Sequence, residues 1–119
     1  MEAKEAAKKA AIAALDKKAE GIEVYDLKGV SSVTDYFVIC TGSTDVHCKA
    51  IYNNIADELK TDNVRPNHVE GVSASRWILM DYVDFVIHIF QPSVREFYGL
   101  ERIWGDVACE VIDEGYYEN

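Results

Sequence analysis

Two pairs of residues are of types that can do chemistry on a nucleotide. Gly42 and Ser43 follow an apolar run and precede a stretch typical of a helix start, where backbone N–H groups favour a phosphate. Nucleotidyltransferases combine such a Gly-Ser turn with two metal-binding carboxylates one residue apart. The candidates here, Asp81 and Asp84, are three positions apart, although a tight hairpin would let them face each other. The favoured interpretation of Gly42 and Ser43 is a tight turn followed by a helix N-cap. A divergent nucleotidyltransferase that uses these four residues is the second interpretation.

The histidines and cysteines form no recognisable site. Metal sites use spacings such as Cys-x-x-Cys or His-x-x-x-His, and neither occurs among His47, His68, His88, Cys40, Cys48 and Cys109. Three irregularly spaced cysteines also give no disulfide framework, which fits a reducing compartment. No catalytic residue, metal site or cofactor is predicted from these residues.

The hydrophobic pattern predicts three helices. The first is rich in Ala, Lys and Glu, covers residues 2 to about 19 and ends near Gly21. The second begins with Ser43 or Thr44 as N-cap and fades by residues 61–63. A short third helix begins at Ser93, and its expected apolar stripe is Val94, Phe97, Leu100 and Trp104.

Strands are expected at residues 22–27, 33–40, 67–71 and twice within 76–90. The run 33–40 is apolar on both faces, which is typical of a strand in the middle of a covered sheet. We predict an α/β (α+β) fold with a mixed sheet of about five strands flanked by helices. A single domain is expected over residues 1–110, followed by an acidic tail at 111–119.

The segment 76–90 predicts a hairpin with two unlike faces. A two-residue turn at Tyr82 and Val83 would place Asp81 opposite Asp84. Because side chains alternate along a strand, one face belongs to the core and carries Ile78, Met80, Phe85, Ile87 and Ile89. The other face carries Trp77, Leu79, Asp81, Asp84, Val86 and His88. An aromatic and aliphatic patch rimmed by carboxylates is typical of a docking surface for a basic protein.

The net charge of the chain narrows the classes of molecule that can be its partner. The formal net charge is −9 over 119 residues, and such a polyanion repels nucleic-acid phosphate. Direct nucleic-acid binding is therefore disfavoured, whereas a basic protein surface is favoured because complementary charge speeds encounter. No stretch is long and apolar enough to span a membrane, and no apolar signal core begins the chain, so a cytoplasmic location is expected.

Several motifs together resemble the ribosomal silencing factors, the RsfS or Iojap family. They are Asp16-Lys-Lys-Ala-Glu-Gly-Ile22, Ser31-Ser-Val-Thr-Asp-Tyr-Phe-Val-Ile-Cys-Thr-Gly-Ser43, Lys49-Ala-Ile51, His68-Val-Glu-Gly71, Trp77-Ile-Leu-Met-Asp-Tyr82, Arg95-Glu-Phe-Tyr-Gly-Leu-Glu101 and Trp104-Gly-Asp106. The resemblance covers residues from about 4 to 106. The chain departs from the family at Gln91, where a histidine is expected, and at Val83, where a glycine is usual. Val83 weakens the expected turn, because valine resists the positive φ that such a turn wants.

The resemblance implies a nucleotidyltransferase-like core without catalytic carboxylates. It also implies a non-enzymatic protein that binds the large ribosomal subunit through its ribosomal protein fourteen and sterically blocks joining of the small subunit, repressing translation. Relatives in organelles are also associated with maturation of the large subunit. The expected contact residues are Trp77, Leu79, Asp81, Tyr82, Asp84, Val86 and His88, with Glu70 at the rim. A homodimeric interaction module that uses the same patch is the third interpretation.

Overall fold

The computed structural model of the protein describes residues 1–105 and 107–115. Within those residues, no helix combines the length and the hydropathy that crossing a bilayer needs. The elements follow in the order α1 (Ala3–Asp16), β1 (Glu20–Asp26), β2 (Tyr36–Thr41), α2 (Asp45–Lys60), β3 (His68–Glu70), β4 (Trp77–Asp81), β5 (Phe85–Phe90), α3 (Pro92–Tyr98), the 3-10 helix η1 (Leu100–Trp104) and β6 (Cys109–Ile112).

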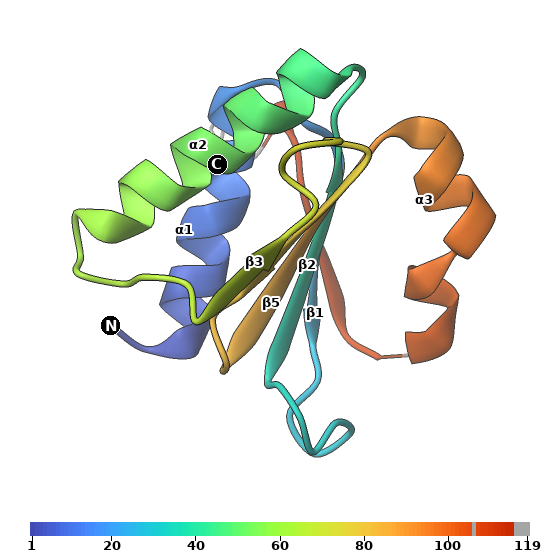
Figure 1. Ribbon diagram of the computed structural model, residues 1–119. Helices are drawn as coiled ribbons and strands as arrows, with labels where there is room; N and C mark the ends of the chain where they lie inside the picture. The colour runs from blue at the N-terminus through green and yellow to red at the C-terminus, as the bar shows by residue number, and fades with distance from the viewer. Residues whose placement is uncertain (106, 116–119) are drawn as a thin grey trace.

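The sheet is mixed, as predicted, and has six strands in the order β3-β4-β5-β2-β1-β6. β2 and β5 pair in parallel, and their neighbours pair antiparallel. Helices α1 and α2 cover one face, whereas α3 lies on the other (Figure 1). We call the face toward α1 and α2 the inner face and the face toward α3 and η1 the outer face.

The inner face holds the larger core. α1 presents alanines to it, of which Ala7, Ala10 and Ala11 have no exposed area, and small side chains let a helix pack closely. α2 adds the predicted stripe of Ile51, Ile55 and Leu59. α1 ends earlier than predicted: Lys18, with φ of 63°, turns the chain, and the Ala19 amide donates to the Ala14 carbonyl. Gly21 therefore lies inside β1 and does not end the helix.

The register of the hairpin differs from the prediction, but its faces do not. Trp77 pairs with Phe90 and Asp81 with Val86, so the turn is centred on Val83 and Asp84. Asp81 and Asp84 are not the opposed pair that the sequence predicted. The difference amounts to a shift of two residues, and because side chains alternate, such a shift keeps every side chain on its expected face. Val83 adopts the unfavourable φ of 73°, and its amide donates to Asp81 Oδ1 at 2.8 Å.

α3 is shorter than the predicted helix. Pro92 occupies its first turn, and Gly99, at φ of 53°, ends it before η1 begins. The stripe prediction is right for Val94, Leu100 and Trp104, which pack on the outer face. It is wrong for Phe97, which is 80% exposed, because α3 packs on the sheet through Val94 and Arg95 and turns Phe97 away from it.

A guanidinium ties α3 to the sheet. Arg95 Nη1 donates to the Gly21 carbonyl oxygen at 2.7 Å and to Thr41 Oγ1 at 2.9 Å. Its Nη2 pairs with Glu23 at 2.7 Å, and its Nε reaches Glu101 at 3.3 Å. Bidentate and charge-assisted contacts of this kind fix geometry as well as adding energy, so α3 is held at the β1 and β2 side of the outer face.

The sixth strand was not predicted. β6 pairs antiparallel with β1 and buries Ile112, which is 1% exposed. The predicted boundary between domain and tail at residue 110 therefore cuts through this strand. Of the predicted acidic tail, residues 116–119 lie outside the described residues.

The edge strand β6 offers a test of its contribution to stability. Replacing Ile112 by Ala should lower the free energy of unfolding by about 2–4 kcal/mol, because it removes a buried side chain and leaves a cavity. Val111→Ala is the matched control: that side chain is 58% exposed and should cost less than about 0.5 kcal/mol. Urea unfolding curves measure both, and equal small effects would show that β6 does not belong to the cooperative core.

Candidate functional site

The outer face of β4 and β5 brings together most of the predicted contact residues. Trp77, Leu79 and Asp81 alternate along β4, and Val86 and His88 lie beside them on β5. In the register, Leu79 pairs with His88, and Val86 pairs with Asp81. We call these five residues the docking surface. The alternation of side chains placed these residues on one face correctly although the predicted register was wrong.

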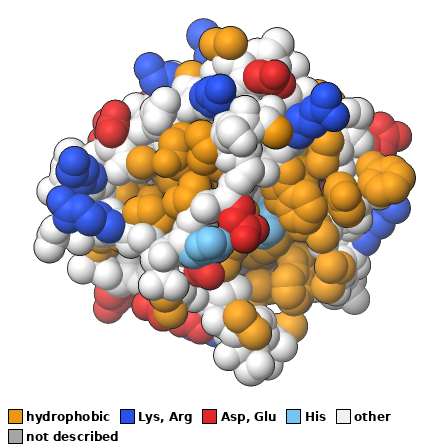
Figure 2. Space-filling view, viewed as in Figure 1, with side chains coloured by type: hydrophobic (Ala, Val, Ile, Leu, Met, Phe, Trp, Pro, Cys, Tyr) orange, Lys and Arg blue, Asp and Glu red, His pale blue; other side chains and the backbone are white. Residues whose placement is uncertain are grey.

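The docking surface is only partly covered by the protein's own helices. Trp77 is half-buried, with its ring 5.0 Å from that of Phe90 and 4.8 Å from that of Tyr98 on α3. Leu79 and Val86 are also half-buried, whereas the core residue Ile39 on β2 has no exposed area. In the space-filling view, hydrophobic side chains gather between α3 and β3, which is the strand nearest the viewer in Figure 1. Histidine and acidic side chains lie beside them (Figure 2). α3 thus covers β1 and β2 and leaves β4 accessible.

Trp77 and His88 are joined by a hydrogen bond that fixes both rings. Trp77 Nε1 donates to His88 Nδ1 at 2.9 Å. Since an indole nitrogen only donates, Nδ1 of His88 carries no proton and the neutral ring holds its proton on Nε2. Burial lowers the pKa of His88 to about 4, so the neutral form persists at physiological pH. The indole is thereby held in one orientation before any partner arrives.

Carboxylates lie at the rim, as predicted. Asp84 is exposed at the hairpin turn, and Asp81 is half-buried, with Oδ1 accepting from the Val83 amide. Glu70 on β3 is exposed and lies 2.9 Å from His68 Nε2. In the register Glu70 pairs with Leu79, which puts its side chain on the outer face next to the docking surface. The rim is therefore acidic on the side away from α3.

Tyr82 does not belong to the docking surface. It is 7% exposed, packs in the inner-face core, and stacks on Phe85 with ring centroids 4.7 Å apart. The predicted turn at Tyr82 and Val83 left its ring outside the strand pattern. In the structure the turn begins one residue later, so Tyr82 continues the alternation of β4 and points inward with Met80.

The residues proposed for nucleotide chemistry are not brought together. Gly42 and Ser43 follow the C-terminal end of β2, beside Phe90 of β5. Asp81 lies at the other end of the sheet, because β4 runs antiparallel to β5 and Asp81 pairs with Val86 near the start of that strand. At about 3.3 Å per residue, the four positions from Val86 to Phe90 span roughly 13 Å, and Gly42 and Ser43 lie beyond Phe90.

The Gly-Ser turn has a structural explanation. A Cβ on Gly42 would lie 2.6 Å from Cys48 Sγ, so glycine is required by close packing. Thr44 Oγ1 accepts from the His47 amide, and His47 Nδ1 accepts from the Ser43 amide at 2.8 Å. Side chains therefore already occupy amides that a phosphate would need. Within the described part of the chain, no group of three or more His, Cys, Asp or Glu side chains could hold a metal ion.

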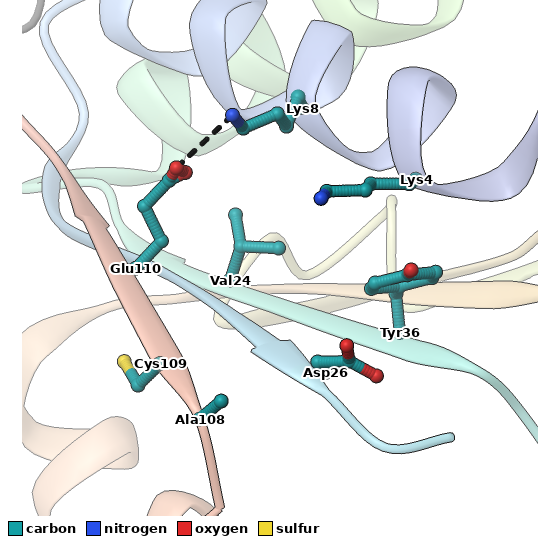
Figure 3. A pocket seen from close by; sticks show the side chains of 8 residues that line it. All are labelled: Lys4, Lys8, Val24, Asp26, Tyr36, Ala108, Cys109 and Glu110. Atoms are coloured by element: carbon teal, nitrogen blue, oxygen red, sulfur yellow. Dashed lines mark ion pairs between the residues drawn. The ribbon is translucent and has the colours of Figure 1, made fainter.

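A pocket of about 220 Å³ lies on the inner side, between α1, β1 and β6 (Figure 3). Lys4 and Lys8 of α1 line it together with Asp26 of β1 and Glu110 of β6, and Lys8 Nζ lies 3.1 Å from Glu110. Its charges are mixed, and the sheet separates it from the docking surface. It is therefore not an extension of that surface.

The sequence pattern missed the part of the outer face that lies beyond the hairpin. Tyr98 packs on Trp77, and Val33 and Ile103 are 82% and 66% exposed beside Val86 and His88. Val33 was assigned to a buried strand, and Ile103 falls off the predicted stripe. An apolar residue off the helical stripe was the available signal for Ile103.

The burial of His88 gives stability a defined pH dependence. Because the pKa of His88 falls from 6.5 unfolded to about 4 folded, the unfolded chain binds an extra proton between these values. Stability should be fully present above pH 6.5 and fall by up to about 3 kcal/mol as the pH drops toward 4. His88→Phe should lose less stability over this window than the wild type. An NMR titration of the His88 ring with a midpoint near 6.5 would contradict this.

The sequence of the chain is similar to those of proteins from one known family. A family model described as ribosomal silencing factor during starvation, RsfS, matches residues 1–118. Ribosomal silencing factor RsfS of Bacillus subtilis is 39% identical over 115 residues, with 97% of this chain and 98% of that protein covered. A Mus musculus protein named mitochondrial assembly of ribosomal large subunit protein 1 is 35% identical over 95 residues, with 70% of this chain and 42% of that protein covered.

Among solved structures, a crystal structure of a Chromobacterium violaceum protein superposes with a TM-score of 0.85 at 32% identity, covering 88% of each chain. The mixed α+β fold predicted from the sequence is thus confirmed, while its likeness to a nucleotidyltransferase core stays a prediction. The match of the family model over nearly the whole length, together with these relatives, shows that the chain belongs to the ribosomal silencing factor family.

Proposed function

We propose that this protein represses translation by binding the large ribosomal subunit through its ribosomal protein fourteen, where it blocks the approach of the small subunit. Membership of the silencing factor family supports a ribosomal target. The name of the mouse relative refers to the large subunit, which supports that subunit as the partner. The protein acts by occupying a surface, so it needs no catalytic residue and no cofactor.

The observation that carries the proposal is the uncovered docking surface. Trp77, Leu79 and Val86 are each half-buried on an outer face that α3 and η1 cover over β1 and β2. Tryptophan at the desolvated centre of an interface typically contributes about 2 kcal/mol or more. Because its hydrogen bond to His88 already holds the indole, little conformational entropy is lost when a partner covers it.

Charge favours a basic protein as the contact. Asp81, Asp84 and Glu70 edge the docking surface, and the whole chain carries a net charge of −9. Exposed ion pairs contribute only about 0–1 kcal/mol each, so these carboxylates mainly steer and orient the partner. Ribosomal RNA would be repelled by the same charge, which is why a ribosomal protein is the proposed contact.

The same surface supports a homodimer as a second candidate. Phe97 and Tyr98 on α3 are 80% and 52% exposed next to Trp77, and an apolar area of this kind is compatible with pairing to its two-fold copy. A homodimer would compete with the ribosome for Trp77. In this scheme the dimer is a storage form. The monomer should be released from it when the protein binds the ribosome.

The proposed contact is tested by truncating two side chains of the docking surface. Trp77→Ala and Leu79→Ala should each weaken co-sedimentation with purified large subunits, Trp77→Ala by about 30-fold, and both should restore subunit joining measured by light scattering. Val46→Ala, at a 78% exposed position on α2, is the control. Since Trp77 also packs on Tyr98, thermal melts check folding. Wild-type levels of binding in both variants would refute the site.

Steering is tested by reversing one rim charge. Asp84→Lys should slow association with large subunits several-fold at low salt while changing dissociation little, and the difference should shrink as salt is added. Asp57→Lys makes the same charge change at an exposed position of α2 and should have a smaller effect. Stopped-flow or surface-binding kinetics give both rates. Equal effects of the two variants would mean that only net charge matters.

A further inference from the structure

An apolar pocket adjoins the docking surface and is not explained by the fold. It has a volume of about 310 Å³ and lies between β5, β2, the loop before β2 and η1. Its walls are the side chains of Val33, Phe37, Val86, Leu100, Ile103 and Trp104, with His88 beside them. Among the described residues, no charged side chain lines it, so it suits neither a phosphate nor a nucleotide.

Two hydrogen-bond donors on residues that line the pocket have no acceptor among the described residues: Trp104 Nε1, which is buried, and His88 Nε2, which is not fully buried. His88 is 8% exposed, and its proton lies on Nε2 because Nδ1 accepts from Trp77 Nε1. Among residues 1–105 and 107–115, no acceptor makes a hydrogen bond with Nε2. The Phe37 ring on β2 lies 4.7 Å from that of His88, and both side chains line the pocket.

A partner that covers the pocket removes water from His88 Nε2–H, and that donor would then cost free energy if the partner supplied no acceptor. The pocket therefore suits an apolar group that carries one acceptor oxygen next to it. In a protein, a large apolar side chain followed by its own backbone carbonyl has this chemistry. The volume lies at the small end of ligand pockets, which suits one side chain better than a larger molecule.

We propose that this pocket receives one large apolar side chain of the ribosomal protein partner, and that a backbone carbonyl next to that side chain accepts a hydrogen bond from His88 Nε2. This inference rests on the proposed function and adds which feature of the partner is recognised. The partner segment also carries a basic residue that faces Asp81 or Asp84 across the docking surface.

A macromolecule fits the pocket better than a small metabolite for two reasons. Val86 and His88 belong both to the pocket and to the docking surface, so a partner that covers Leu79 continues into the pocket. Val33 and Ile103 flank its mouth and are 82% and 66% exposed. A small molecule inside the pocket would leave both in water, whereas a protein surface would cover them and gain their burial.

The mouth of the pocket can be changed without touching the core. Ile103→Ala should weaken binding to purified large subunits by about tenfold and Ile103→Asp by more, because a charge at the mouth is desolvated on binding. Val46→Asp adds the same charge at an exposed position of α2, behind the sheet, and should bind like the wild type. Thermal melts of all three should match the wild type, since Ile103 is mostly exposed.

The donor is tested directly by NMR of the His88 ring. With ¹⁵N-labelled protein and isolated ribosomal protein fourteen, the Nε2–H proton should become visible, protected from exchange and shifted downfield on binding. His88→Phe identifies the signal by its absence. An unprotected proton in the saturated complex would overturn the hydrogen bond.

The outcomes separate the pocket from the proposed function. Weakened binding of the Ile103 variants supports the pocket. Normal binding of these variants together with loss in Leu79→Ala would overturn the pocket and leave the proposed function standing. Absence of wild-type binding to large subunits would overturn both. Light scattering could instead show a wild-type dimer that dissociates in Ile103→Asp while ribosome binding stays unchanged. That result would overturn the pocket proposal and make a second copy of the chain the occupant.

Discussion

Unequal coverage of the two sheet faces is the constraint on which the site depends. The inner face is sealed by two long helices, and Ile78, Met80, Ile87 and Ile89 on it have no exposed area. The outer face has only α3 and η1, and Arg95 holds these over β1 and β2. The strands at the other edge thus keep one apolar face open. An open apolar face on an acidic protein is stable in water only when it is small or matched to a partner.

The Trp77–His88 hydrogen bond converts this open face into an ordered site. A tryptophan on a bare sheet would sample several rotamers, and a partner would lose that freedom on binding. Here the indole donates a hydrogen bond to His88, and the Tyr98 ring of α3 packs against it. The same bond places the imidazole proton on Nε2. One contact therefore orients the surface and leaves a donor for the partner.

Features that looked enzymatic have packing explanations in the structure. Gly42 is small because Cys48 lies against it, and the first amides of α2 are capped by Thr44 and His47. Burial raises the pKa of the Cys40 thiol to about 12, so it is not a nucleophile at neutral pH. Asp81 supports the turn at Val83. Gly42, Thr44, His47 and Cys40 thus serve the scaffold, whereas Asp81 both supports the turn and belongs to the docking surface.

The sequence alone determined the three helices, five of the six strands and the two faces of the hairpin strands. Alternation along a strand and four-residue spacing along a helix depend only on local geometry, so Trp77, Leu79, Val86 and His88 were placed together, and Ile51, Ile55 and Leu59 were placed in the core. Thr44 was predicted as an N-cap for the same local reason. The hairpin register was wrong, but the error was two residues, which a period-two pattern cannot detect.

Only the tertiary structure decided what covers the outer face. Phe97 was predicted to be buried and is exposed, because Arg95 reaches Gly21 and Glu23, far away in sequence, and so decides which side of α3 faces the sheet. β6 exists because β1 offers it an edge, although its four residues give no strong pattern of their own. The pocket beside His88 joins β5, the loop at Val33 and η1. Contacts between such distant segments are set by packing, which local periodicity does not contain.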